Sequence, residues 1–159
     1  MARWNMAQLA RTSADFATAA RLLCAFNAEF DDPYPNEEWL ADRLARLDRR
    51  GDTFVALAEE HQVAIGVAVA RVRPQFWEDA NECYLAELYV VPGLRGRGFG
   101  SGLLRFVIDE ARVRDCTFMD LTTTDHDAQA MALYEAAGFD RNEGKGPGGP
   151  TSFYYELEL

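Results

Sequence analysis

Two stretches near the N-terminus carry apolar residues at helical spacing. Over residues 16–30 the apolar positions fall on one helical face, and they are Leu22, Leu23, Phe26 and Phe30. Residues suited to an N-cap precede this stretch at positions 12, 13 and 15. After a break at Pro33 and Pro35, Asn36 can cap a second helix, whose apolar stripe is Leu40, Leu44 and Leu47. The pattern therefore predicts two consecutive amphipathic helices.

Apolar runs of strand length follow. Residues 53–59 and 63–71 are predicted to form a β-hairpin around a turn at 60–62. Residues 82–91 make a strand that is apolar on both faces apart from Glu87. The other expected strands are residues 3–10, residues 117–123, and a final pair that Arg141 and residues 153–159 form around the loop 144–150.

Two more helices complete the predicted order. One follows a glycine-rich segment, with Leu103, Leu104, Val107, Ile108 and Ala111 as its apolar positions. The other spans residues 128–137 and is closed by Gly138, which suits a left-handed C-terminal cap. The order β-α-α-β-β-β-α-β-α-β-β predicts an α/β (α+β) fold. We expect a single domain, residues 1–159, with a mixed, mostly antiparallel central sheet of about six to seven strands flanked by four helices.

The charge balance bears on the partners. The chain has 26 acidic and 16 basic residues, a net charge of −10. Such a surface repels the phosphates of nucleic acids, so we expect no nucleic-acid partner. It would favour a cationic substrate, although net acidity also serves solubility alone.

Other function classes are disfavoured by what the chain lacks. No apolar run approaches the ~18 residues of a membrane span, and residues 1–11 lack the apolar centre of a signal peptide. We therefore expect no membrane association and a cytoplasmic location. Cys24, Cys83 and Cys116 are odd in number and widely spaced, which favours buried free thiols over disulfides or a metal site, so no metal is expected.

The segment 84–104 is the main functional signal. It joins an apolar strand, a Pro-Gly turn, alternating glycines and the start of a helix, an arrangement that offers unpaired backbone N–H groups to an anionic phosphate. Glycines at 96, 98, 100 and 102 do not fit the G-x-G-x-x-G dinucleotide fingerprint, and the Gly-Lys-Ser/Thr end of a P-loop is missing. The motif that fits is Arg95-x-x-Gly98-x-Gly100.

Two motifs resemble those of one family. LYVVPGLRGRGFGSGLL, residues 88–104, resembles the acyl-CoA-binding motif of the GNAT superfamily, the Gcn5-related N-acetyltransferases, in which Arg/Gln-x-x-Gly-x-Gly/Ala follows a strand. DAQAMALYEAAGF, residues 127–139, is similar to the family's Asn-x-x-Ala-x-x-Leu-Tyr-Glu-x-x-Gly-Phe helix. Within the family, residues 54–91 look loosely like the small aminoglycoside 3-N-acetyltransferases.

The resemblance implies acetyl-CoA as acyl donor and no metal. The pyrophosphate would lie on backbone N–H groups of the glycine loop, and arginines there would add charge-assisted hydrogen bonds. The pantetheine arm would run beside the preceding strand as an added strand, where a backbone N–H would polarise the thioester carbonyl. The expected cofactor-binding residues are Leu88, Tyr89, Val90, Arg95, Gly96, Arg97, Gly98, Phe99, Gly100, Ser101 and Asp127. Asp127 replaces the family's Asn, so it acts either as a helix cap alone or as an acceptor for a pantetheine amide.

Two residues are candidates for the proton transfers. Tyr134 stands at the family's general-acid position, where a phenol of pKa ~10 can protonate the leaving thiolate; a core aromatic is the alternative. Glu87 is the candidate base, because a charge inside an apolar strand requires a task or a partner. Its alternatives are a water relay, orientation of the amine, and a structural pair with an arginine.

The acceptor side is implied by the family's use of the first two helices and their connection. Here those positions are Glu29, Asp31, Asp32, Tyr34, Glu37, Glu38 and Trp39, with Phe76, Trp77, Glu78 and Asp79 as further candidates. Acidic and aromatic residues together suit a cationic amine. We expect an acetyl-CoA-dependent N-acetyltransferase that acts by direct attack of a primary amine on a small, polyamine- or aminoglycoside-like substrate. A protein N-terminal or lysine acetyltransferase and a non-catalytic CoA-binding sensor stay open, a homodimer is compatible with the sequence, and the acceptor itself is undetermined.

Overall fold

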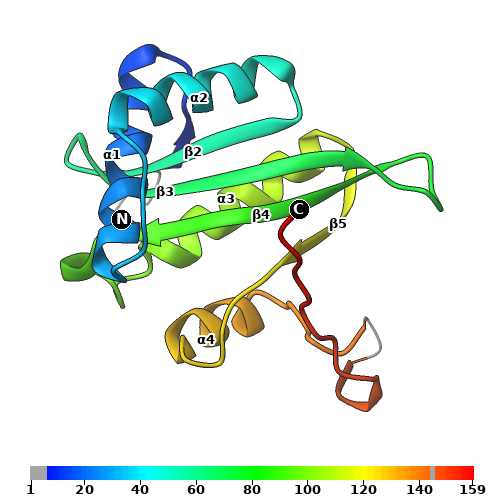
Figure 1. Cartoon of the computed structure of the whole chain (residues 1–159). Helices are drawn as coiled ribbons and strands as arrows, with labels where there is room; N and C mark the ends of the chain where they lie inside the picture. Colours follow the sequence, from blue (N-terminus) through cyan, green and yellow to red (C-terminus); the bar gives the residue numbers. More distant parts are fainter. Residues whose placement is uncertain (1–6, 144–145) are drawn as a thin grey trace. The chain divides into compact units, whose positions relative to one another are not determined.

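The computed structural model describes residues 7–143 and 146–159. Its contacts divide the chain into two compact units, Met1–Leu121 and Thr122–Leu159. The first unit holds the sheet and three α-helices, and the second holds the fourth α-helix and the C-terminal segment (Figure 1). Residues 3–6 of the expected first strand lie outside the described residues.

The first unit is built on one five-stranded sheet. Its strands lie in the order β1 (Ala7–Leu9), β2 (Thr53–Glu60), β3 (Val63–Pro74), β4 (Asn81–Val90) and β5 (Cys116–Leu121). The first three junctions are antiparallel, and β4 pairs with β5 in parallel. The predicted mixed, mostly antiparallel sheet is thereby confirmed.

Helices cover both faces of this sheet. Helices α1 (Ser13–Glu29) and α2 (Glu37–Arg50) pack on one face, while α3 (Phe99–Val113) lies behind β3 and β4 on the other (Figure 1). The predicted caps form: Thr12 and Asp15 make a reciprocal capping box at the start of α1, and the Asn36 side chain accepts from two N–H groups of α2. These caps determine where each helix begins.

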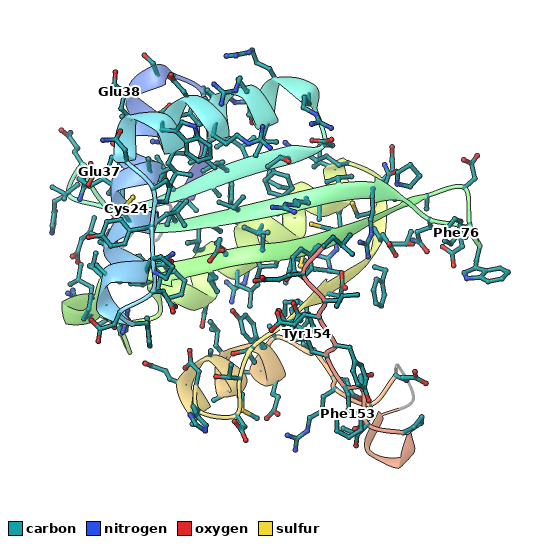
Figure 2. The ribbon with its side chains drawn as sticks, in the orientation of Figure 1. Cys24, Glu37, Glu38, Phe76, Phe153 and Tyr154 are labelled. Atoms are coloured by element: carbon teal, nitrogen blue, oxygen red, sulfur yellow. The ribbon has the colours of Figure 1, made fainter. Side chains whose placement is uncertain are left out.

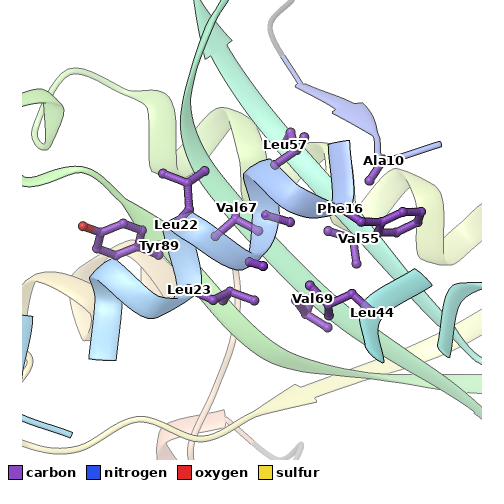
Figure 3. Packing of buried hydrophobic residues seen from close by; sticks show 12 residues of the cluster. Ala10, Phe16, Leu22, Leu23, Leu44, Val55, Leu57, Val67, Val69 and Tyr89 are labelled. Atoms are coloured by element: carbon purple, nitrogen blue, oxygen red, sulfur yellow. The ribbon is translucent and has the colours of Figure 1, made fainter. Parts of the chain in front are cut away.

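The core under α1 and α2 is made of aliphatic and aromatic side chains from both helices and three strands (Figure 3). Leu22, Leu57 and Val67 are at most 1% exposed. Burial of each such side chain contributes about 1.5–3 kcal/mol. Tyr89 of β4 belongs to the same cluster, so the strand that carries the candidate site is anchored in the core.

The second unit contains α4 (Ala128–Ala136) and a short 3-10 turn, Gly146–Gly148. The expected final strand pair does not form in it: residues 151–159 have no regular secondary structure, and one backbone hydrogen bond, from Ser152 N to the Arg141 oxygen (2.9 Å), joins the two segments. The sheet therefore has five strands rather than six or seven. A strand is stable only beside a paired neighbour, and the described part of this unit offers none.

Cys24, Cys83 and Cys116 are free thiols; the first two are buried and the third is half-buried. Burial raises the pKa of the Cys83 thiol to about 12. Within residues 7–143 and 146–159, none of the helices has both the length and the apolar character needed to cross a membrane.

Candidate functional site

A β-bulge in β4 determines where Glu87 points. In the β3–β4 ladder Val69 pairs with Glu87. The next residue, Ala70, pairs with Leu85, which leaves Ala86 as the extra residue of the bulge. Directly opposite residues of an antiparallel pair share a face of the sheet, and Val69 lies in the core under α1 and α2. Glu87 therefore faces the α1–α2 side, whereas strict alternation from Leu85 without a bulge would have turned it toward α3.

The same face carries further polar side chains. Arg71 pairs with Tyr84 across β3 and β4, and Tyr84 pairs with Asp120 across β4 and β5. Two residues further along β3 and β4, Arg73 and Glu82 form a salt bridge. We refer to these side chains together as the polar strip, which consists of Arg71, Arg73, Glu82, Tyr84, Glu87 and Asp120.

Burial perturbs both carboxyls at the centre of the polar strip. Burial raises the pKa of Glu87, and the nearby Arg71 opposes the rise. Burial also raises the pKa of Asp120, against the opposing charge of Arg73. The Asp120 Oδ1 atom is buried and has no hydrogen-bond partner among the described residues. Carboxyls with raised pKa are better proton acceptors than exposed ones, and a buried acceptor without a partner is suited to an incoming donor.

Beyond the bulge, one edge of β4 is open. Within the described chain, β5 pairs with β4 from Asn81 to Leu85, and β4 continues past that point. The Val91 N–H donates to the Ile65 oxygen (2.9 Å) on the β3 side. Because successive residues of a strand alternate in direction, Leu88 and Val90 present their backbone groups on the side away from β3. This edge is where an extended ligand could add as a strand.

The glycine loop then leads directly into α3. Gly96 and Gly98 have φ of +74° and +89°, a left-handed conformation that favours glycine. Gly98 is the N-cap of α3, and no side chain of the described residues caps the helix. The N–H groups of Gly100 and Ser101 lie in the first turn, at the positive end of the helix dipole. This arrangement fits an anionic group such as the CoA pyrophosphate.

The two arginines of the loop are engaged with carboxylates. Arg95 donates two hydrogen bonds to Glu29, at 2.6 and 2.8 Å, and its Nε donates to the Val90 oxygen at 2.8 Å. Arg97 forms a 2.9 Å ion pair with Glu60. These two side chains are thus already engaged, and a phosphate would instead meet the N–H groups of Gly100 and Ser101.

The second unit carries the other two predicted residues. Asp127 is the N-cap of α4, where its side chain accepts from the Ala130 N–H at 2.9 Å. This geometry supports the helix-cap alternative for Asp127. Tyr134 is half-buried on α4, and its ring packs edge-on against Phe139 at 5.9 Å.

The candidate acceptor residues do not all gather in one place. Glu37 and Glu38 lie at the start of α2, whereas Phe76 lies at the far end of the β3–β4 hairpin (Figure 2). Phe76 and Trp77 are almost fully exposed, at 98% and 93%. The hairpin tip and the α1–α2 connection are therefore separate surfaces of the first unit.

The family follows from a match that covers most of the chain. The family model described as the acetyltransferase (GNAT) family matches residues 17–139. This chain belongs to the GNAT family. Its relatives include the aminoglycoside N(6′)-acetyltransferase type 1 of Stenotrophomonas maltophilia, which is 32% identical over 83% of this chain and 84% of that protein. The thialysine N-epsilon-acetyltransferase of Bos taurus is 37% identical over a shorter stretch, 39% of this chain and 36% of that protein.

A solved structure agrees with the sequence relatives. The crystal structure of a presumptive acetyltransferase from Arthrobacter sp. FB24 is 37% identical, covers 99% of both chains and has a TM-score of 0.84. The sequence-based assignment to the GNAT acetyltransferases and the predicted fold class are confirmed. The aminoglycoside relative is named for the 6′ position, not for the 3 position of the enzymes that residues 54–91 resemble.

Some features of this GNAT site had no sequence signal. The bulge at Ala86 is invisible in the apolar run 82–91, and without it Tyr84 and Asp120 could not be placed on the face of Glu87. Arg71 and Arg73 could have been suspected, because they interrupt the apolar pattern at the end of β3.

Proposed function

We propose that this GNAT acetyltransferase transfers an acetyl group from acetyl-CoA directly to a primary amine of a small cationic molecule, polyamine-like or aminoglycoside-like. The observation that carries the proposal is the N-terminus of α3 behind the left-handed Gly98, at the end of a strand; within residues 7–143 and 146–159 no side chain caps this helix and no strand pairs with that end of β4 on the side away from β3. We also propose that the two units form one acetyltransferase domain. The family match across residues 17–139 supports this.

The backbone would hold the acyl donor. Acetyl-CoA supplies a thioester, whose acetyl group is the part transferred. The first-turn N–H groups of α3 at Gly100 and Ser101 would bind the pyrophosphate. The outward backbone groups of Leu88 and Val90 would pair with the pantetheine arm, and one of their N–H groups would stabilise negative charge on the thioester oxygen. The Val90 oxygen already accepts from Arg95. The backbone groups of Leu88 and the Val90 N–H would therefore pair with the pantetheine arm and the thioester oxygen.

Side chains would manage the protons. Glu87 would take a proton from the ammonium of the substrate, directly or through a water, because burial raises its pKa toward that of a useful base. Tyr134 would donate its phenolic proton to the departing thiolate, and the phenolate so formed would take the second proton of the amine nitrogen. This role is assigned from its place in the second motif. Asp127 would act as the helix cap of α4.

The acceptor assignment is supported by charge. The polar strip contributes Glu87 and Asp120, and the Asp120 Oδ1 is buried without a partner among the described residues. The exposed residues Asp31, Asp32 and Tyr34 follow α1. The S. maltophilia relative is named for aminoglycosides, which are small polycationic amines. This combination favours a small cationic amine over a protein substrate.

Binding and turnover test the proposal separately. Calorimetric titration of the wild type with acetyl-CoA should show binding, and a thiol-release assay should show turnover on aminoglycosides with a free 6′-amine or on spermidine. The Gly100→Glu variant should lose acetyl-CoA affinity while staying folded, because glutamate is favourable in a first helical turn but occupies the phosphate site. Arg105→Glu, exposed and further along α3, is the control for added negative charge; it changes the charge by two units, against one in Gly100→Glu.

Three results would contradict the proposal. No binding of acetyl-CoA by the wild type would remove the cofactor assignment. Turnover on peptides but on no small amine would point to protein acetylation. Binding without any turnover would point to a CoA sensor.

A further inference from the structure

Arg95 ties three parts of the first unit together. Its two terminal nitrogens bind both oxygens of Glu29, and its Nε binds the Val90 oxygen at the end of β4. The side chains of Arg95 and Glu29 are partly exposed, at 28% and 27%. A bidentate pair in this environment has fixed geometry as well as charge complementarity. The glycine loop is thus joined to the last residue of α1.

Two aromatic rings, one from β4 and one from α1, pack next to this ion pair. The Arg95 guanidinium lies over the Tyr89 ring, 5.4 Å from its centre. Tyr89 in turn stacks on Phe26 of α1, with ring centres 5.0 Å apart. Burial raises the pKa of Tyr89, and the nearby Glu29 carboxylate adds to the rise. Glu29 therefore lies close to β4 as well as to the glycine loop.

The segment that follows Glu29 is held to α1. The Asn27 side chain donates to the Pro33 oxygen at 2.8 Å, and the Asp32 N–H donates to the Asn27 oxygen at 2.9 Å. Asp31 adopts a left-handed φ of +55° at the turn. Residues 31–36, the connection loop, carry three exposed acceptor candidates, Asp31, Asp32 and Tyr34. A displacement of the end of α1 would therefore move these side chains as well.

We propose that Glu29 is a positioning residue that holds the connection loop in register with the glycine loop, and that Arg95 acts as its tie rather than as a phosphate ligand. The inference rests on the proposed function. In the pair, the Glu29 carboxylate neutralises the Arg95 charge, so that charge contributes little attraction for a pyrophosphate. Breaking the Glu29–Arg95 ion pair should then weaken the binding of the amine without weakening that of acetyl-CoA.

The test is Glu29→Gln, measured with acetyl-CoA and with an amine on which the wild type turns over. The KM for the amine should rise about five- to tenfold, a usual size for coupling between sites, because the connection loop loses its anchor. The affinity for acetyl-CoA, measured by calorimetry, should stay the same or improve, because a negative charge is removed and Arg95 is released. A general loss of structure would weaken both substrates together.

Glu60→Gln is the matched control. It makes the same carboxyl-to-amide change against Arg97 of the same loop, at 2.9 Å, but Glu60 ends β2, and no hydrogen bond or ion pair among the described residues joins it to α1. The KM for the amine should stay within twofold of the wild type. In a double-variant cycle, Glu29→Gln combined with Arg95→Gln should raise the amine KM no more than either change alone, because both remove one interaction.

Different outcomes overturn different claims. Equal weakening of both substrates by Glu29→Gln, or an amine KM equal to that of Glu60→Gln, would overturn the positioning role while leaving the proposed function intact. Failure of the wild type to bind acetyl-CoA would overturn both. If Glu29→Gln does not fold, Arg95→Lys carries the same test, since it keeps the charge but loses the bidentate geometry.

Discussion

The left-handed backbone of Gly98 allows a prediction with a calculable magnitude. Its φ is +89°, and a Cβ placed there would meet no atom within 4 Å. The cost of Gly98→Ala should therefore come from backbone conformation alone, without a steric clash. Placing a residue with a Cβ in the left-handed region costs about 1–2 kcal/mol. For a chain of this size, that lowers the melting temperature by about 2–8 °C.

Two neighbouring glycines provide control variants that should not lower the free energy of unfolding. Gly102 lies in the first turns of α3 and Gly93 in the turn before the loop, and a Cβ at either position also meets nothing within 4 Å. Neither has a positive φ. Gly102→Ala should stabilise the protein by about 0.5–1 kcal/mol, because alanine is the better helix former. Gly93→Ala should be neutral or stabilising by about 0.4–1 kcal/mol.

Urea unfolding of the three variants, monitored by far-UV circular dichroism, measures these differences directly. Calorimetry with acetyl-CoA should also show weaker binding by Gly98→Ala, since relief of the strain moves the N–H groups of the loop. Equal stability of Gly98→Ala and Gly102→Ala would refute the reasoning, because it would mean that the left-handed conformation is not required.

Two further predictions concern the proton-transfer residues. Glu87→Gln should lower turnover about a hundredfold and remove the ionisation that limits activity at low pH. The folded-state pKa of Glu87 is raised, so the carboxyl is favourable to folding when protonated, and that contribution is lost as the pH rises through the folded pKa. Glu87→Gln should accordingly be more stable than the wild type at pH 7, and this gain in stability should vanish near pH ~4, below the unfolded pKa. If the pH profile of activity is the same in Glu87→Gln as in the wild type, Glu87 is not the general base. Tyr134→Phe should lower kcat about tenfold or more without changing acetyl-CoA affinity, whereas Tyr155→Phe, which is 88% exposed, should be silent; equal kcat for the two variants would remove the general-acid role.

Local signals in the sequence predicted much of the fold. Capping residues at Thr12 and Asn36 and the stripes behind them located α1 and α2, since caps and periodicity act within a few residues of each other. The glycines at 96 and 98 and the strand before them located the phosphate-type loop. The Asp127 cap of α4 was equally local.

Features that depend on pairing between distant residues could not be predicted. The direction of Glu87 depends on an extra residue opposite Val69, and nothing in the run 82–91 distinguishes Ala86 as that residue. The ion pair between Arg95 and Glu29 had no sequence signal, because Glu29 lies 66 positions earlier in the chain. Residues 153–159 were predicted to pair with the segment at Arg141 as a final strand pair, but a strand requires a neighbour, which sequence alone does not supply.

Since no side chain of the described residues caps α3, the stability of the protein between reactions is affected by what binds there. On the proposed function, the cosubstrate is the helix cap, so folding stability depends on how well the site is filled. A ligand at a hundred times its Kd adds about 2.7 kcal/mol to the free energy of unfolding. The empty enzyme would then be the form most open to proteolysis, and its abundance in a cell would follow the acetyl-CoA supply. Phosphate or sulfate in a purification buffer would act on the same helix end, protecting the fold while competing with the substrate.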